Sequence, residues 1–258
     1  MTDSAPLFFV GLHHPGDARH FVRACLSVNV LRGRKKPIDC DEVLVDSGAF
    51  TKIAQHGGYR HEPKAYADEL LRLHVSGVVK IVAAVAQDFM CESFMLAKTG
   101  LTIDDHQRLT IERYDALIRE NLPFPILPVL QGYAPADYAT HVRAYGDRLK
   151  PGMWVGVGSV CKRNGRPESV LAVLIAIKSV RPDLRLHGFG LKQTALEHPG
   201  IRSLLYSSDS MAWSFAARRE GRNGNSVEEA KAFSRRITSI SSRPREWWQP
   251  SFVPCLSG

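Results

Sequence analysis

The sequence predicts a single α/β domain built as a compact, eight-stranded TIM-type (β/α) barrel, and three observations support this fold. The chain has 258 residues, which is the usual size of one such barrel. Short apolar runs alternate with segments of helical periodicity, as in a parallel sheet covered by helices. Most of these runs end in Gly, Asp, Gln or Ser, and a barrel collects such strand ends in one ring around its active site.

Seven apolar runs are candidate strands, and five segments between them are candidate helices. The strands are expected at residues 7–11, 43–46, 78–88, 125–131, 153–158, 184–190 and 203–209. The helices are expected at residues 64–73, 103–119, 136–149, 168–180 and 227–237. Residues 24–30 supply the eighth strand or a helix, since periodicity allows both. An open doubly wound sheet is the alternative architecture.

Composition indicates one folded domain. Hydrophobic residues make up 44% and charged residues 23% of the chain, which argues against disorder. We expect residues 1–240 to form the barrel, without an interdomain linker. Residues 241–258 are rich in Pro and Trp and are expected to form an irregular tail packed on the barrel.

Neither a membrane span nor a metal site is expected. The longest apolar stretches, 78–86 and 171–177, are much shorter than the roughly 20 residues of a spanning helix. The N-terminus lacks the pattern of a signal peptide, so a cytoplasmic location is expected. The five cysteines are odd in number and include no CxxC pair, which predicts reduced thiols. No cofactor is expected.

Net charge favours a polyanionic partner. The formal charge is +8 and the pI is about 9.4, and basic surface attracts phosphate at long range. Residues 210–258 hold eight Lys or Arg against four Asp or Glu, and a second basic cluster comprises Arg32, Arg34, Lys35 and Lys36. Taken alone, these charges are equally compatible with an ordinary solvated surface.

Three carboxylates each end a candidate strand: Asp46, Asp88 and Asp209. Each could cap a following helix. In a barrel, however, all three would face one pocket, where neighbouring carboxylates shift each other's pKa and divide the roles of nucleophile and acid/base. Gln131 ends a fourth strand, and its amide offers the donor and acceptor that suit a purine-like base.

Two glycine-rich segments bring backbone close to the same pocket. The first contains Gly158 and Ser159, but Cys161 occupies the position of the third glycine of a dinucleotide loop, so that motif is rejected. The second contains His187, which has no metal spacing and is expected to be a packed or hydrogen-bonded histidine on residue grounds alone.

Seven segments, taken in order, carry a family resemblance. They are VDSGAF at 45–50, QDFMCE at 87–92, HQRLTIERY at 106–114, PVLQGY at 128–133, VGVGSVCKRNG at 155–165, RPDLRLHGFGLK at 181–192 and YSSDSMAWSF at 206–215. Together they resemble the tRNA-guanine transglycosylase superfamily, and most closely its DNA-acting branch, the DpdA family of DNA 7-deazaguanine transglycosylases. Each segment is weakly specific, whereas the ordered set spans almost the whole chain.

The resemblance implies an eight-stranded barrel and a ping-pong exchange of bases. By position, Asp209 matches the nucleophile, which attacks the sugar C1′ as guanine departs. Asp46 matches the acid/base, which protonates the leaving guanine and then takes a proton from a free 7-deazaguanine base, preQ0 or a related derivative. This division agrees with the chemistry of two-step retaining displacements, in which a carboxylate nucleophile works beside a second carboxyl group.

The resemblance also assigns residues that hold the base. Asp88 and Gln131 match hydrogen-bonding residues, and Gly158 and Ser159 offer backbone groups. Two further residues, Phe50 and His187, occupy the positions at which the superfamily stacks the base between side chains.

One difference from the tRNA enzymes bears on whether DNA or tRNA is the substrate. The tRNA enzymes have a zinc site of three cysteines and a histidine after the nucleophile. Here Cys255 is the only cysteine after Asp209, and no histidine follows His198. We therefore expect a barrel without the zinc subdomain, DNA as partner, and a bacterial or phage-infected host cytoplasm as location.

The basic C-terminal region is the candidate phosphate track. Its arginines are Arg218, Arg219, Arg222, Arg235 and Arg236, which could instead pair with Glu220, Glu228 and Glu229 on a helix surface. Three alternatives stay open from sequence: exchange on tRNA, a catalytically silent nucleic-acid-binding barrel, and a glycosidase that releases the base to water. Both a monomer and a homodimer are compatible with the sequence.

Overall fold

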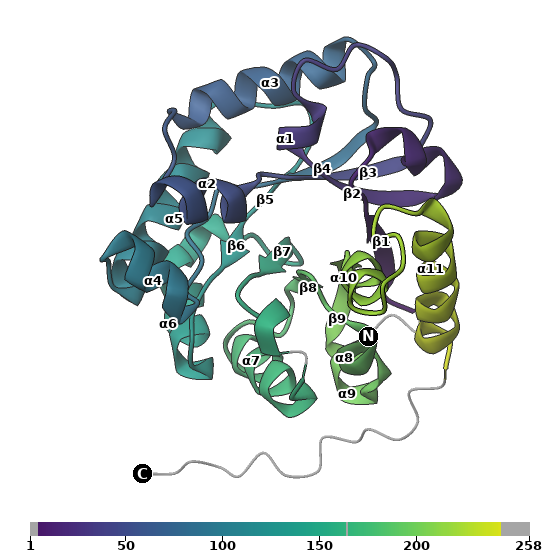
Figure 1. Cartoon of the computed structure of the whole chain (residues 1–258). Helices are drawn as coiled ribbons and strands as arrows, with labels where there is room; N and C mark the ends of the chain where they lie inside the picture. Colours follow the sequence, from purple (N-terminus) through teal and green to yellow (C-terminus); the bar gives the residue numbers. More distant parts are fainter. Residues whose placement is uncertain (1–4, 164, 244–258) are drawn as a thin grey trace.

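The computed structural model describes residues 5–163 and 165–243, which form a nearly closed barrel of parallel strands surrounded by helices (Figure 1). The order of strands in the sheet is β5-β4-β3-β2-β1-β9-β8-β7-β6. Their bounds are Leu7–Gly11 (β1), Arg23–Ser27 (β2), Glu42–Asp46 (β3), Ile81–Val85 (β4), Ile126–Leu127 (β5), Val129–Leu130 (β6), Trp154–Val157 (β7), Arg185–Gly188 (β8) and Leu205–Ser210 (β9). Every pairing between them is parallel.

The prediction of eight strands is wrong, because the described residues form nine. The candidate strand at 125–131 is divided at Pro128 into β5 and β6. Proline has no backbone N–H to donate to a ladder, so regular pairing is interrupted there. β5 pairs with β4, and β6 pairs with β7. The two ends of the sheet order are therefore consecutive in the chain, which nearly closes the barrel and excludes an open doubly wound sheet.

The helices cover the outside of the barrel (Figure 1). Residues 24–30 contain the end of a strand and the start of a short helix, so both predictions for this segment are confirmed in part. The longer helices fall where periodicity predicts them. The bounds are Val28–Leu31 (α1), Ala49–His56 (α2), Pro63–Val75 (α3), Ser93–Thr99 (α4), Ile103–Arg119 (α5), Pro135–Tyr145 (α6), Pro167–Val180 (α7), Gln193–Glu197 (α8), Pro199–Leu204 (α9), Ala212–Arg219 (α10) and Val227–Ser241 (α11), with short 3₁₀ turns at Pro15–His20, Gly146–Arg148 and Cys161–Arg163.

Across the described residues, buried apolar side chains form three clusters, of which the smallest joins α2, α4 and the loop after β4. One cluster contains only strand residues, among them Phe9, Leu44, Leu127 and Val129, so it fills the interior of the barrel. A larger cluster contains strand and helix residues and lies between the sheet and its surrounding helices. The interior cluster closes the barrel below the carboxyl ends of the strands and forms the floor of the site described next.

In the part of the chain that the structure describes, no helix has the length and apolar character needed to cross a membrane. The tail predicted for residues 241–258 begins within α11, which ends at Ser241. Residues 244–258 of that tail lie outside the described residues.

Candidate active site

Carboxylates gather at the carboxyl ends of the strands, as predicted. Asp46 is the last residue of β3, Asp209 is the fifth residue of β9, and Asp88 follows β4 by three residues. The three groups influence one another electrostatically. The negative charge of Asp209 contributes to a raised pKa at Asp46, and that of Asp46 does so at Asp88. The carboxylates therefore share one region of low polarity above the barrel interior.

Asp209 is held by one oxygen. Its Oδ1 accepts hydrogen bonds from the backbone N–H of Gly190 at 3.0 Å and lies 3.2 Å from Nε2 of His187. Within the described part of the chain, Oδ2 has no hydrogen-bond partner, and the side chain is 14% exposed. A carboxylate anchored in this way presents a single oriented oxygen, which is the requirement for a nucleophile.

Asp46 is a carboxyl group whose pKa is raised toward neutral pH. Burial is the main cause that raises its pKa to about 6, and the charge of Asp209 adds to this, while the N–H of Gly48 acts in the opposite direction. That N–H donates to Oδ2 of Asp46 at 2.8 Å. Gly48, at φ 72°, is the N-cap residue of α2, and no side chain caps this helix. Asp46 is thus free of the capping role that the sequence also allowed.

A chain of polar side chains runs from Asp88 across the site. The amide nitrogen of Gln131 donates to Oδ2 of Asp88, and Oγ of Ser159 lies 2.7 Å from the amide oxygen of Gln131 and 2.9 Å from Oε2 of Glu92. All four side chains are buried. Burial, with the charge of Asp46 second, raises the pKa of Asp88 to about 7. These groups offer the acceptors and donors that a guanine-like base requires.

Gly158 lets the backbone lie against this polar chain. A Cβ at this position would meet the Gln131 amide at 2.1 Å, so a side chain would displace the amide. The carbonyl of Gly158 accepts a hydrogen bond from the hydroxyl of Tyr138 at 2.8 Å. Ser159 follows in the left-handed region at φ 54°, an uncommon conformation for a residue with a side chain. There its Oγ accepts from the N–H of Cys91 at 2.9 Å.

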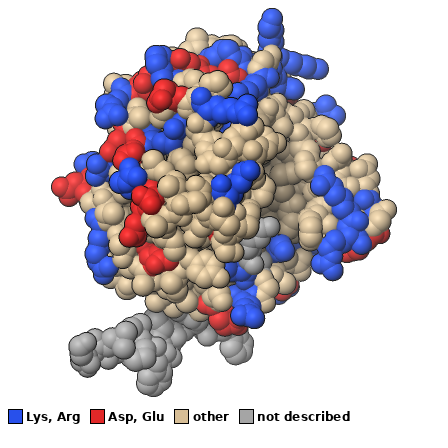
Figure 2. All heavy atoms as spheres, turned by 60° about the vertical axis from the view of Figure 1, so that its left-hand side comes forward, with Lys and Arg blue, Asp and Glu red and all other residues tan. Residues whose placement is uncertain are grey.

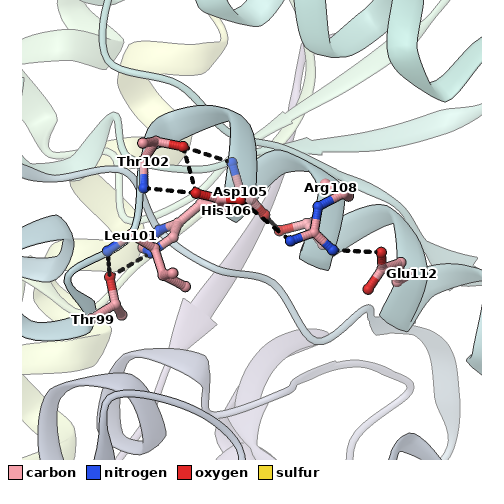
Figure 3. Close-up of polar contacts among 8 residues, drawn as sticks. Thr99, Leu101, Thr102, Asp105, His106, Arg108 and Glu112 are labelled. Atoms are coloured by element: carbon pink, nitrogen blue, oxygen red, sulfur yellow. Dashed lines mark hydrogen bonds and ion pairs between the residues drawn. The ribbon is translucent and has the colours of Figure 1, made fainter.

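Helix α5 fixes the two loops that carry Asp88 and Gln131. The helix begins with a capping box between Thr102 and Asp105, and the ring of His106 lies against Thr99 on the preceding helix (Figure 3). His106 also contacts the carbonyl of Met90 at 2.7 Å. One turn of helix thereby joins α4, α5 and the loop that follows Asp88.

The same helix reaches the second loop. The amide nitrogen of Gln107 donates to the carbonyl of Gln131 at 2.7 Å, and Thr110 accepts from the N–H of Phe89 at 2.9 Å. Arg113 donates to the amide oxygen of Gln87 at 2.8 Å. These contacts give a physical reason for the segment at 106–114, because its side chains position the loops that carry Asp88 and Gln131.

The two residues predicted to stack the base lie in different surroundings. Phe50, in the first turn of α2, is 51% exposed, and its ring centroid lies 6.1 Å from that of Phe94. His187 has no exposed surface, and its Nδ1 lies 2.9 Å from Oγ of Ser207. Phe50 is therefore open to a ligand, whereas His187 contacts the candidate nucleophile from inside the barrel.

The basic C-terminal residues differ in their partners. Arg222 forms ion pairs with Glu220 and Glu229, while Arg218 contacts His13 and Asn225. The remaining three candidates, Arg219, Arg235 and Arg236, are exposed. On the face shown in Figure 2, Lys and Arg gather along the upper edge and at the right, while Asp and Glu lie mainly toward the left.

Three residues that the structure places in the site, Glu92, Trp154 and Ser207, were not singled out from the sequence. Glu92 binds Ser159, and Trp154 donates through Nε1 to Ser207 at 2.8 Å, which in turn contacts His187. Glu92 lies within the segment at 87–92, so its position in that segment was the available signal. Among the described residues, no group of three or more His, Cys, Asp or Glu side chains could hold a metal ion.

The fold and the site together define a (β/α)-barrel protein whose strand ends carry acidic and amide side chains, the arrangement typical of barrel enzymes. The chain belongs to the DpdA family: the model described as "DpdA: DeoxyPurine in DNA protein A" matches residues 7–234. DpdA is the DNA deazapurine transglycosylase family, so the family inferred from the seven sequence segments is confirmed. No curated protein matches the chain.

Proposed function

We propose that this protein exchanges guanine in DNA for a free 7-deazaguanine base, preQ0 or a related derivative, through a covalent intermediate on Asp209. The observation that carries the proposal is the pairing of two unlike carboxyl groups. Asp209 has one anchored oxygen and one open oxygen, and the pKa of Asp46 is raised to about 6, so this carboxyl group can give and take a proton near neutral pH. Retaining base exchange needs a nucleophile and an acid of this kind.

In the first half of the reaction, Oδ2 of Asp209 attacks the sugar C1′ as the bond from C1′ to the guanine nitrogen breaks. The electron pair of that bond leaves with guanine, and the carboxyl proton of Asp46 neutralises the departing base. In the second half, Asp46 takes a proton from the ring nitrogen of the incoming 7-deazaguanine. That nitrogen attacks C1′ and releases Asp209 as a carboxylate, so the sugar keeps its configuration.

Base recognition follows from the polar chain. An ionised Asp88 accepts from the N–H groups on the Watson–Crick edge of guanine, which are donors. Gln131, Gly158 and Ser159 supply amide and backbone groups around the same edge, and Phe50 offers an exposed ring on which the base can stack. Of the five candidate arginines after Asp209, the proposed contacts to phosphates are Arg218, Arg219, Arg235 and Arg236, because Arg222 is paired with Glu220 and Glu229.

The direct test is base exchange. Wild-type protein is incubated with a guanine-containing DNA oligonucleotide and a labelled 7-deazaguanine base, and incorporation and trapped protein–DNA adduct are measured. Asp209→Asn is expected to abolish both, and Asp46→Asn to abolish exchange. Asp183→Asn is the matched control, because Asp183 precedes β8 at the other end of the barrel and pairs with Arg181.

Adduct in Asp209→Asn together with its loss in Asp46→Asn would show that the two roles are reversed. Exchange on tRNA but not on DNA would overturn the proposed polymer. Free guanine released without incorporation would show a hydrolase, and no reaction on either polymer would show a silent barrel.

A further inference from the structure

A pocket of about 700 Å³ opens beside the polar chain of the site. Ser159 and Glu92 form one wall, and Phe94, Tyr133 and Arg166 are among the other lining residues. This volume lies within the roughly 300–1,000 Å³ of small-molecule sites. Since Ser159 also contacts Gln131, the pocket adjoins the position proposed for the exchanged base.

Several exposed aromatic rings lie at this end of the barrel. Among residues 5–163 and 165–243, the large aromatic side chains classed as exposed are Phe50 (51%), Phe94 (43%), Tyr133 (57%) and Phe215 (57%). Each lies in the segment that follows the carboxyl end of a strand: Phe50 in α2 after β3, Phe94 in α4 after β4, Tyr133 in the loop after β6 and Phe215 in α10 after β9. Exposed apolar groups gathered in one region mark a binding surface.

Both positively and negatively charged side chains line the pocket. Arg163 donates to the carbonyl of Ser159 at 3.2 Å and also to that of Tyr133, and its guanidinium lies 5.2 Å from the Tyr133 ring centroid. Arg166 is exposed, and no ion pair ties it to an acid in the described part of the chain. The carboxylate of Glu92 lies at the inner wall, where Ser159 contacts it. A ligand with donors at one end and a negative group at the other would match this division.

We propose that this pocket holds an unpaired nucleotide adjacent to the exchanged guanine, with its base stacked on Tyr133 or Phe94 and its phosphate near Arg166. The inference rests on the function proposed above. A guanine must leave its stack before its glycosidic carbon can be attacked, and its neighbour then loses a stacking partner. Aromatic rings replace that partner for any base, because every base has a π-face.

The test combines a protein variant with a DNA variant. Binding of a short single-stranded oligonucleotide with one guanine is measured for wild type, Tyr133→Ala, Phe94→Ala and Tyr133→Phe, and for Ile118→Ala as an exposed apolar control on α5. The oligonucleotide is also made with an abasic residue on either side of the guanine. Loss of a stacking ring is expected to weaken binding by roughly tenfold, and Tyr133→Phe to preserve it.

An abasic residue on one side of the guanine should weaken binding by the wild-type protein. The same abasic residue should have little further effect on whichever of Tyr133→Ala and Phe94→Ala has lost the ring that stacks on the neighbouring base. Independent, additive losses in both Tyr133→Ala and Phe94→Ala, or unchanged binding in both, would overturn the pocket assignment. Base exchange by the wild-type protein, measured on the same oligonucleotides, distinguishes this outcome from a failure of the proposed function. If wild type exchanges guanine while the variants bind DNA normally, only the pocket assignment is wrong.

A second inference comes from the hydrogen bonds beneath Asp209. Nε1 of Trp154 can only donate, so it occupies a lone pair of Ser207 Oγ at 2.8 Å. The Ser207 hydroxyl hydrogen can then go to Nδ1 of His187, 2.9 Å away. In that tautomer Nε2 carries the ring proton and donates it to Oδ1 of Asp209. The opposite tautomer would point a lone pair at the carboxylate.

We infer that His187 is a positioning residue, which Trp154 and Ser207 hold in the tautomer that anchors Asp209 and leaves Oδ2 open. The inference rests on Asp209 as nucleophile. His187→Leu and Ser207→Ala are expected to slow covalent adduct formation by about tenfold or more, since each removes a bond in a chain that ends on a charged group. His187→Gln, which retains a donor, should restore part of the rate.

Affinity for free guanine should stay unchanged in all three variants, which separates positioning from a general structural role. Lower base affinity with a normal adduct rate would instead assign His187 to stacking the base and overturn this inference. Ser207→Ala keeps the test decisive if His187→Leu does not fold.

Discussion

The pKa of Asp88 leads to a prediction about stability. Burial, followed by the charge of Asp46, raises this pKa from 3.8 to about 7. Over that range the folded protein keeps a proton that the unfolded chain has lost, so the free energy of unfolding falls as pH rises from about 4 to 7. At about 1.4 kcal/mol per pKa unit, the full effect is about 4 kcal/mol.

Asp88→Asn removes the titration and keeps an acceptor for the Gln131 amide. We therefore expect the stability of this variant, relative to wild type, to increase by up to about 4 kcal/mol between pH 4 and pH 8. Urea unfolding at half-unit pH steps measures the difference. Another buried group, His141, has a pKa lowered to about 4 by burial and titrates in both proteins, so its contribution cancels.

Asp183→Asn provides a control of opposite sign. Hydrogen bonds from Arg181 hold the pKa of Asp183 below its ordinary value, so its contribution is present above about pH 4 and is lost as pH falls below that value. The stability difference between this variant and wild type should stay constant from pH 5 to pH 8. A flat difference for Asp88→Asn over pH 4 to 8 would refute the raised pKa and the low polarity assigned to the site.

Three further predictions concern the phosphate track, the base pocket and metal content. Replacing Arg218 and Arg219 together by Ala should reduce the slope of log DNA affinity against log salt concentration by about 0.9 per lost phosphate contact. Arg222→Ala should leave the slope nearly unchanged, because Glu220 and Glu229 already neutralise that side chain. Equal slopes in the wild type and both variants would exclude the phosphate track. Gly158→Ala should displace the Gln131 amide and weaken guanine binding by about tenfold without lowering the melting temperature to a similar degree, as calorimetry and unfolding would show. Elemental analysis should find no tightly held zinc, and one zinc per chain would contradict this.

The sequence was sufficient for most of the barrel. Alternation of apolar runs and helical segments located each of the seven candidate strands and the five longer helices, because long periodic segments carry strong signals. The short helices α2, α4, α8, α9 and α10 were not predicted, since they have five to eight residues and show little periodicity. The division at Pro128 was missed because the apolar run around it is continuous.

Site residues were predictable where they end strands. Asp46, Asp88 and Gln131 were found because a parallel barrel brings strand ends together regardless of their distance in sequence. Glu92 and Trp154 were missed because their roles depend on contacts with Ser159 and Ser207, which are 67 and 53 residues away. No pattern in the local sequence indicates contacts between residues so far apart, so they are seen only in the three-dimensional structure.

In the proposed reaction, the division of labour between Asp209 and Asp46 follows from how many donors each carboxyl group receives. Oδ1 of Asp209 has two neighbours that can donate, the backbone N–H of Gly190 and the ring of His187, and these fix the orientation of the carboxylate. Asp46 has one, the backbone N–H of Gly48, and burial together with the negative charge of Asp209 outweighs it, so the pKa of Asp46 rises to about 6. We therefore propose opposite tasks for these two chemically identical side chains, and the adduct measured in Asp46→Asn and Asp209→Asn distinguishes them.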